Sequence, residues 1–311
     1  MRQQEKQLIR EALRQYVGRY PSQNKAAASL KDVSVATVSN ILAGKDATIT
    51  AEVWKKLAAQ LGVVADGWKV VDTSAYTEIT TAMADAQTLR NVMWIVGEAG
   101  CGKTTAAKQY ASDHRNVYYI LCSEDMKRGD FIKEVARVVG IKAQGFTIGQ
   151  TWQCILHELV QREHQLLIFD EADKLTDNVF SYFVSLYNKV EEHAGIIFLS
   201  TEYICKRISL GLQNEKKGYK ELFSRIGRKF YHLEAAGTDD VAAICRANGI
   251  DDEEEIRRVL RECTTDVMAY KHKGDRLNGM EAEYDFRRVK KSVQRTLLLR
   301  RHYATANTAA R

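Results

Sequence analysis

The segment Gly97–Thr104 reads GEAGCGKT and fits the GxxxxGK[ST] spacing of a phosphate-binding loop. Its glycines let the backbone curl until successive N–H groups point at a phosphate, and Lys103 would reach the β- and γ-phosphate oxygens. An apolar run at 91–96 precedes it and a helical pattern at 104–113 follows, the strand–loop–helix setting this chemistry needs. We therefore expect ATP to be held by Gly97, Glu98, Ala99, Gly100, Cys101, Gly102, Lys103, Thr104 and Thr105.

A second acidic motif supplies the groups that hydrolysis would require. The segment 166–173 reads LLIFDEAD, an apolar strand ending in Asp170 and Glu171. Asp170 and the Thr104 hydroxyl would hold Mg²⁺, and Glu171 would activate the attacking water. The alternative is a strand that ends in a solvated acidic turn. Beside a complete phosphate loop, the pair favours an ATP hydrolase over a small-molecule kinase.

Two further side chains fit such a site. Thr201 follows the apolar run 195–200 and could orient the water, although Ser and Thr often end strands. Arg225, in ELFSRIGRKF (221–230), precedes a last strand expected at the far edge of the sheet. There it could reach a neighbouring subunit's nucleotide as an arginine finger, with Arg228 as a second nucleotide contact. A surface salt bridge is the alternative for Arg225.

The elements that position these residues alternate in type. Five apolar runs, at 91–96, 116–122, 165–170, 195–200 and 228–233, are separated by amphipathic stretches including 129–140 and 149–164. This alternation predicts an α/β fold with a five-stranded parallel sheet. We expect a helical N-terminal domain at 1–66, a linker with a leading helix at 67–90, the ATPase core at 91–235 and a helical basic part at 236–311.

The N-terminal segment 24–45 fits a helix-turn-helix. Asp32 stands at the turn, where a left-handed backbone is needed, and Ser34 should cap the second helix. The surface expected to face a DNA groove contains Thr37, Ser39, Asn40 and Lys45. These residues include few strong base readers, which predicts weak sequence specificity. A plain three-helix bundle for protein contacts is the alternative.

The segment 286–303 contains seven Lys or Arg residues on a helical pattern. A cationic helix face releases condensed counterions when it meets phosphates, so we expect double-stranded DNA to bind there. The residues expected in contact are Arg287, Arg288, Lys290 and Lys291. A solvated helix face is the alternative.

The three motifs GEAGCGKT, IFDEAD and ELFSRI, with the N-terminal module, resemble the AAA+ ATPase family and, within it, the transposition regulator ATPases. The resemblance implies ATP and Mg²⁺ as cofactors, a ring or helical filament on DNA, and a transposase partner. It also implies DNA contacts by Lys127 and Arg128. One departure is Met268, where the family often has a sensor arginine, so Lys271 or Lys273 would have to substitute; another is Thr201, where asparagine is common.

Composition narrows the class of protein. The chain has 311 residues, a formal net charge of +6 and six cysteines without metal-ligand spacing. The N-terminus reads as a charged amphipathic helix, and no apolar run approaches the ~20 residues of a membrane span. We expect a protein of the bacterial cytoplasm. A helicase loader and an ATP-switched transcription regulator remain the alternative functions.

Overall fold

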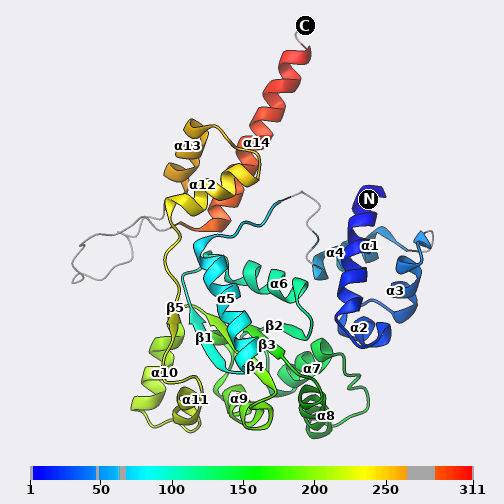
Figure 1. Cartoon of the computed structure of the whole chain (residues 1–311), viewed down its shortest axis with the longest axis vertical. Coiled ribbons are helices and arrows are strands. Elements are labelled where there is room, and N and C mark those ends of the chain that lie inside the picture. The colour runs from blue at the N-terminus through cyan, green and yellow to red at the C-terminus, as the bar shows by residue number, and fades with distance from the viewer. Residues whose placement is uncertain (1–2, 47–48, 62, 64–67, 265–283, 310–311) are drawn as a thin grey trace. The chain divides into compact units, whose positions relative to one another are not determined.

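The computed structural model describes residues 3–46, 49–61, 63, 68–264 and 284–309 (Figure 1). These residues form two compact units. The first unit comprises 1–67, 80–96 and 106–231, and the second comprises 68–79, 97–105 and 232–311.

The sheet has five strands in the order β2-β3-β4-β1-β5, and the predicted five-stranded α/β fold is confirmed. The strands are β1 (Val92–Val96), β2 (Val117–Leu121), β3 (Gln165–Asp170), β4 (Ala194–Ser200) and β5 (Tyr231–His232). The last strand is shorter than the predicted 228–233. Arg228 has a φ of 57°, and this left-handed turn delays the extended backbone.

Alternating residues of each strand pack on opposite faces of the sheet, as the period of two requires. On one face, Trp94, Phe169 and Phe198 join a large apolar core with the helices that follow β2, β3 and β4. On the other face, Gly195 lies so close to α5 that an added Cβ would be 2.1 Å from the Ala86 carbonyl oxygen. Helices therefore cover both faces, which buries β3 and β4 completely.

The helices of this region follow the strands in the α/β order. They are α5 (Ser74–Leu89), α6 (Lys103–Asp113), α7 (Arg128–Val139), α8 (Ile148–Val160), α9 (Asp177–Val190), α10 (Tyr203–Gln213) and α11 (Tyr219–Arg225). A 3-10 turn, η2 (Ala172–Lys174), follows β3. Helix α8 ends four residues before the predicted boundary at 164 because β3 begins at Gln165 after a short turn.

Four helices, which we call the N-terminal module, precede the sheet. They are α1 (Gln3–Gly18), α2 (Gln23–Ser29), α3 (Val35–Leu42) and α4 (Ala51–Gln60). Leu13, Ile41 and Trp54 are fully buried in a core of their own. The local predictions at the turn are confirmed: Asp32 has a φ of 56°, and the Ser34 side chain accepts from the Thr37 N–H.

The second unit ends in three helices, α12 (Thr238–Ala247), α13 (Glu253–Cys263) and α14 (Phe286–Ala309). Val241, Val259 and Val293 lie in its core. Trp68 packs against this core, and the Asn248 side chain pairs with the backbone of the segment before α5. No helix among the described residues is both long and apolar enough to cross a membrane.

Candidate nucleotide site and nucleic-acid interface

The loop 97–102 has the curled backbone expected of a phosphate loop. Gly100 and Gly102 have φ values of 90° and 101°, which residues with side chains rarely adopt. Gly97 is buried, and a Cβ there would lie 2.8 Å from Leu233 Cδ1. Glycine at these positions therefore serves both conformation and close packing.

Lys103, the first residue of α6, is held over this loop. Its ammonium donates to the carbonyl oxygens of Gly97 at 2.6 Å and Glu98 at 2.8 Å, and its Nζ lies 3.7 Å from the Cys101 Sγ. The positive charge thus lies at the helix N-terminus, where an anion is favoured. Glu98, Ala99 and Thr105 are exposed, while Thr104 is half-buried.

The same loop contacts the start of α14 within the second unit. The Phe286 N–H donates to the Gly100 carbonyl at 3.1 Å, and a Cβ on Gly102 would be 3.5 Å from the Phe286 ring. A Cβ on Gly100 would lie 2.1 Å from Asp285 Oδ1. The carboxylate of Asp285 therefore lies directly against the phosphate loop.

Asp170, the last residue of β3, is 1% exposed. Its Oδ2 accepts from the Tyr119 hydroxyl at 2.7 Å, and its Oδ1 accepts from the Glu171 N–H at 3.0 Å. Burial, and then the Asp170 charge, raise the pKa of Tyr119, so the phenol stays a donor. These bonds hold the carboxylate in one orientation at the end of the strand.

Glu171 follows in a left-handed conformation with a φ of 56°. Its carboxylate is paired with Lys174 at 2.7 Å, and both side chains are more than a third exposed. The hydrogen bond from Lys174 to Glu171 raises the pKa of the lysine. The predicted water-activating carboxylate is therefore engaged by a cation on the adjacent turn.

Thr201 follows β4, and its hydroxyl donates to Asp173 Oδ2 at 2.8 Å. The preceding Ser200 faces the core, where its hydroxyl accepts from the Trp94 indole at 2.7 Å. Of the two hydroxyls at this strand end, only that of Thr201 is outside the core.

The sheet register relates these groups. Val96 of β1 pairs with Ser200 of β4, and Phe169 of β3 pairs with Phe198. Because parallel strands end at the same edge, the strand end before Gly97 and the strand ends at Asp170 and Thr201 share that edge. Carboxylate oxygens suit a hard divalent cation, so Asp170 brings to this edge donor atoms of the kind that Mg²⁺ prefers.

Arg225 and Arg228 are both exposed. The Arg225 guanidinium lies 5.0 Å from the centre of the Tyr187 ring. Within the described part of the chain, neither arginine makes a side-chain salt bridge, so the surface-pair alternative has no partner here. Both side chains are thus available at the edge beyond α11.

The predicted DNA-facing residues of the N-terminal module are mostly accessible. Ser39 and Lys45 are exposed, and Thr37 and Asn40 are half-buried. The Thr37 hydroxyl lies 2.9 Å from that of Ser34, so it is engaged at the start of α3. Lys127 and Arg128, at the start of α7, are exposed, and Arg128 lies over the Tyr182 ring at 5.4 Å.

The cations of α14 divide into two groups. Arg288 donates to the backbone of Glu262 and Thr264, and Lys290 lies 5.2 Å from the centre of the Trp68 ring. By contrast, three exposed residues four apart make no side-chain hydrogen bond or ion pair with described residues. We call them the cationic stripe: Arg287, Lys291 and Arg295.

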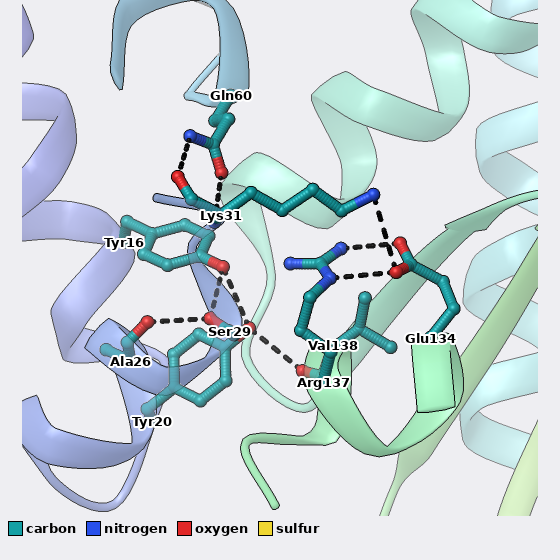
Figure 2. Close-up of polar contacts among 9 residues, drawn as sticks. All are labelled: Tyr16, Tyr20, Ala26, Ser29, Lys31, Gln60, Glu134, Arg137 and Val138. Carbon is teal, nitrogen blue, oxygen red and sulfur yellow. Dashed lines mark hydrogen bonds and ion pairs between the residues drawn. The ribbon is translucent and has the colours of Figure 1, made fainter. Parts of the chain in front are cut away.

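The N-terminal module is docked on α6, α7 and α8 within the first unit, and Figure 2 shows its contacts with α7. The Tyr20 hydroxyl donates to the Val138 carbonyl at 3.0 Å. The Tyr16 hydroxyl lies within hydrogen-bond distance of the hydroxyls of Tyr20, at 3.1 Å, and Ser29, at 2.6 Å. Lys31 lies 3.5 Å from Glu134, which also pairs with Arg137.

Two further contacts extend this docking. Lys25 pairs with Glu158 at 2.7 Å, and Arg19 donates to the Ala111 carbonyl at 2.9 Å. Burial opposes ionisation of Glu134, but Arg137 and then Lys31 lower the pKa of its carboxyl. Among the described residues, none of the hydrogen bonds or ion pairs between module and core comes from α3. Helix α3 therefore keeps its outer face free of this docking.

Sequence reasoning did not identify Asp285 or Lys174 as parts of the site. Each is an ordinary charged residue in its segment, and its role depends on partners brought together by the fold. The position Met268, and with it Lys271 and Lys273, lies outside the described residues.

Residues 86–208 match the AAA domain family. The Mu-like prophage FluMu DNA transposition protein B of Haemophilus influenzae is 24% identical over 72% of this chain and 76% of its own length. The ATP-dependent target DNA activator B of Escherichia phage Mu is 24% identical over 75% of this chain and 77% of its own.

A solved structure supports the fold alone. The Aeropyrum pernix ORC1 protein, in complex with DNA, aligns with a TM-score of 0.51 at 14% identity, over 76% of this chain and 63% of that chain. Residues 86–208 are therefore similar to the AAA domain family, and the chain is similar to the transposition B proteins of Mu-like phages.

Proposed function

We propose that the protein is an ATP hydrolase that binds double-stranded DNA without strong sequence preference and assembles on it as a ring or filament. The observation that carries the proposal is that β1, which leads into the phosphate loop, and β3, which ends in the carboxylate Asp170, both pair in parallel with β4 in one sheet. The printed names of two relatives, an ATP-dependent target DNA activator and a DNA transposition protein, support a role in transposition target selection. Its partner would then be a transposase in the bacterial cytoplasm.

In this proposal each side chain has one task. Lys103 and the loop N–H groups would bind the triphosphate, and Asp170 and Thr104 would hold Mg²⁺, which would supply positive charge to neutralise the phosphates. Once its ion pair with Lys174 opens, Glu171 accepts a proton from the attacking water, and Thr201 orients that water. Arg225 acts from the neighbouring subunit, with Arg228 beside it.

DNA would be bound by three groups of residues. The cationic stripe supplies phosphate contacts, with Arg288 and Lys290 behind it, and Lys127 and Arg128 add charge on the core. Helix α3 would act as the second helix of a helix-turn-helix, supported by the left-handed Asp32 and the Ser34 cap.

Two experiments test this proposal. Glu171→Gln should bind ATP normally while its turnover falls by at least about 100-fold, since the base is removed and the binding groups remain. Near-normal hydrolysis by this variant would overturn the role of Glu171. Footprinting separates the alternatives: indifferent coating of DNA favours the proposal, whereas a defined palindromic site favours a transcription regulator.

A further inference from the structure

Arg207, on α10, lies at the centre of a polar network in the first unit. Its guanidinium donates to the Asp173 carbonyl at 2.9 Å, to Asp177 Oδ1 at 2.5 Å and to the Tyr219 hydroxyl at 3.2 Å. It also lies 4.3 Å from the centre of the Phe180 ring. The side chain is only 16% exposed, so these contacts fix it in one place.

One arm of the network reaches the end of β4. Asp173 lies in the 3-10 turn η2, where its carboxylate accepts from the Thr201 hydroxyl at 2.8 Å and its carbonyl accepts from Arg207. Arg207 therefore bonds to the backbone of Asp173, and Thr201 bonds to its side chain. The position of Thr201 is thereby tied to that of Arg207.

The other arm reaches the first residue of α11. Tyr219 is 2% exposed, and its hydroxyl donates to Asp177 Oδ1 at 2.6 Å. Its ring packs so closely on Gly211 that a Cβ there would lie 2.1 Å from the ring. Helix α11 has seven residues and ends at Arg225, so the anchoring of Tyr219 sets where that arginine emerges.

The central ion pair is strong for a position near the surface. Burial opposes ionisation of Asp177, but hydrogen bonds led by those from Tyr219 and Arg207 lower the pKa of the carboxyl to about 2. Asp177 also pairs with Lys216 at 3.2 Å, and the Lys216 ammonium lies 5.9 Å from the centre of the Tyr219 ring, so that lysine belongs to the same network. Lys206, the exposed neighbour of Arg207 on α10, makes no side-chain hydrogen bond or ion pair with described residues and is the matched control.

We propose that Arg207 is a positioning residue that holds α11 in register with the end of β4, so that Arg225 is presented to the neighbouring subunit in the geometry its nucleotide requires. This inference rests on the proposed function, because it assumes that Arg225 completes a site in another subunit. Arg207 itself touches no nucleotide. Its effect passes through Asp177 and Tyr219 to the helix that carries Arg225.

The test uses mixed assemblies of the full-length chain on DNA. Arg225→Ala subunits keep a nucleotide site but lack the arginine, and Glu171→Gln subunits bind ATP without turning it over but donate the arginine. ATP hydrolysis by the mixture then reports only donated Arg225. Adding Arg207→Gln to the Glu171→Gln donor should reduce the kcat of the mixture about tenfold with KM for ATP unchanged within twofold. Adding Lys206→Ala to the donor should change neither value.

Every outcome bears on the inference. Donors with Arg207→Gln that rescue as well as their parent would overturn it. No rescue by the parent donor would contradict the shared site, and the inference would fall with the proposed function. If Arg207→Gln donors do not fold, as judged by circular dichroism, Asp177→Asn donors replace them and should show the same fall in kcat.

Discussion

The Phe286 N–H donates to the Gly100 carbonyl at 3.1 Å, joining the start of α14 to the phosphate loop within one compact unit. The helix that bears the cationic stripe therefore begins on the loop that would bind ATP. Asp285 is part of this junction, since its carboxylate lies against Gly100 and caps α14 by accepting from the Arg287 N–H at 2.8 Å.

The Asp285 carboxylate should weaken triphosphate binding by charge repulsion. Asparagine caps a helix about as well as aspartate, so Asp285→Asn removes the charge and keeps the cap. We expect ATP affinity to rise about fivefold, equivalent to ~1 kcal/mol, as measured by calorimetric titration at low salt. Asp285→Ala serves as a comparison that also loses the cap. Unchanged or weaker ATP binding by Asp285→Asn would contradict this role.

Lys174 should restrain hydrolysis by holding Glu171. Replacing it with methionine frees the carboxylate while keeping the length of the side chain. We expect DNA-independent ATP turnover to rise about threefold or more, measured by phosphate release. The double variant Lys174→Met, Glu171→Gln is the control and should be inactive. Turnover that falls in the single variant would instead assign Lys174 a direct part in the reaction.

The cationic stripe should carry much of the salt dependence of DNA binding. Each lost phosphate contact reduces by about 0.9 the magnitude of the slope of the logarithm of the DNA association constant against the logarithm of the salt concentration. Arg287→Ala, Lys291→Ala and Arg295→Ala should each show this change in fluorescence anisotropy titrations. Arg300, paired with Glu255 and the Gly249 carbonyl, is the control on the same helix. Equal effects at Arg300 and at the stripe would refute the assignment.

The docking of the N-terminal module should contribute to stability through Lys25 and Glu158. A double-mutant cycle with Lys25→Met and Glu158→Gln should give a coupling of about 0.5 kcal/mol in urea unfolding, because the pair is partly exposed. Lys56, which pairs only within the module at its exposed face, is the control. A cycle between Lys56→Met and Glu158→Gln should give no coupling. A coupling energy of zero between Lys25 and Glu158 as well would show that the docking contact does not persist in solution.

Lowering the pH should protonate Asp177 and weaken its ion pairs with Arg207 and Lys216 over a defined range of pH. Its folded pKa is about 2 against an ordinary value of 3.8, so ionised Asp177 stabilises the fold above pH ~4. That contribution is lost as the pH falls from about 4 to about 2. The difference in unfolding free energy between the parent and Asp177→Asn should therefore shrink over this range. A difference that stays constant from pH 5 to pH 2 would contradict the ion-pair network.

The strands and the loop could be predicted from local pattern because each depends on neighbouring residues. The runs at β1 to β4 are mainly apolar, and the loop Gly97–Thr104 needs glycine at left-handed positions. The boundary of β5 could not be predicted, because the left-handed backbone of Gly227 continues into Arg228, a residue type that rarely adopts this conformation.

The contacts around the site, by contrast, could not be predicted from the sequence. The contacts of Asp285 with Gly100, of Lys174 with Glu171, and of Arg207 with Asp173 depend on how segments meet in space. From the sequence alone, charged residues at such positions are expected to lie on the solvated surface. The helix-turn-helix assignment of α2 and α3 remains a prediction, since docking through α2 fits a DNA-binding module and a protein-binding bundle equally.

The most direct test is cosedimentation of the protein with non-specific duplex DNA, with and without ATP and Mg²⁺. We expect ATP to increase bound protein at least about tenfold and Lys103→Ala to abolish this increase, because the loop can no longer hold the triphosphate. The Glu171→Gln variant should stay bound after ATP is added, since it cannot turn ATP over. Lys103→Ala that still binds DNA as strongly as the parent in saturating ATP would contradict the coupling of nucleotide to DNA.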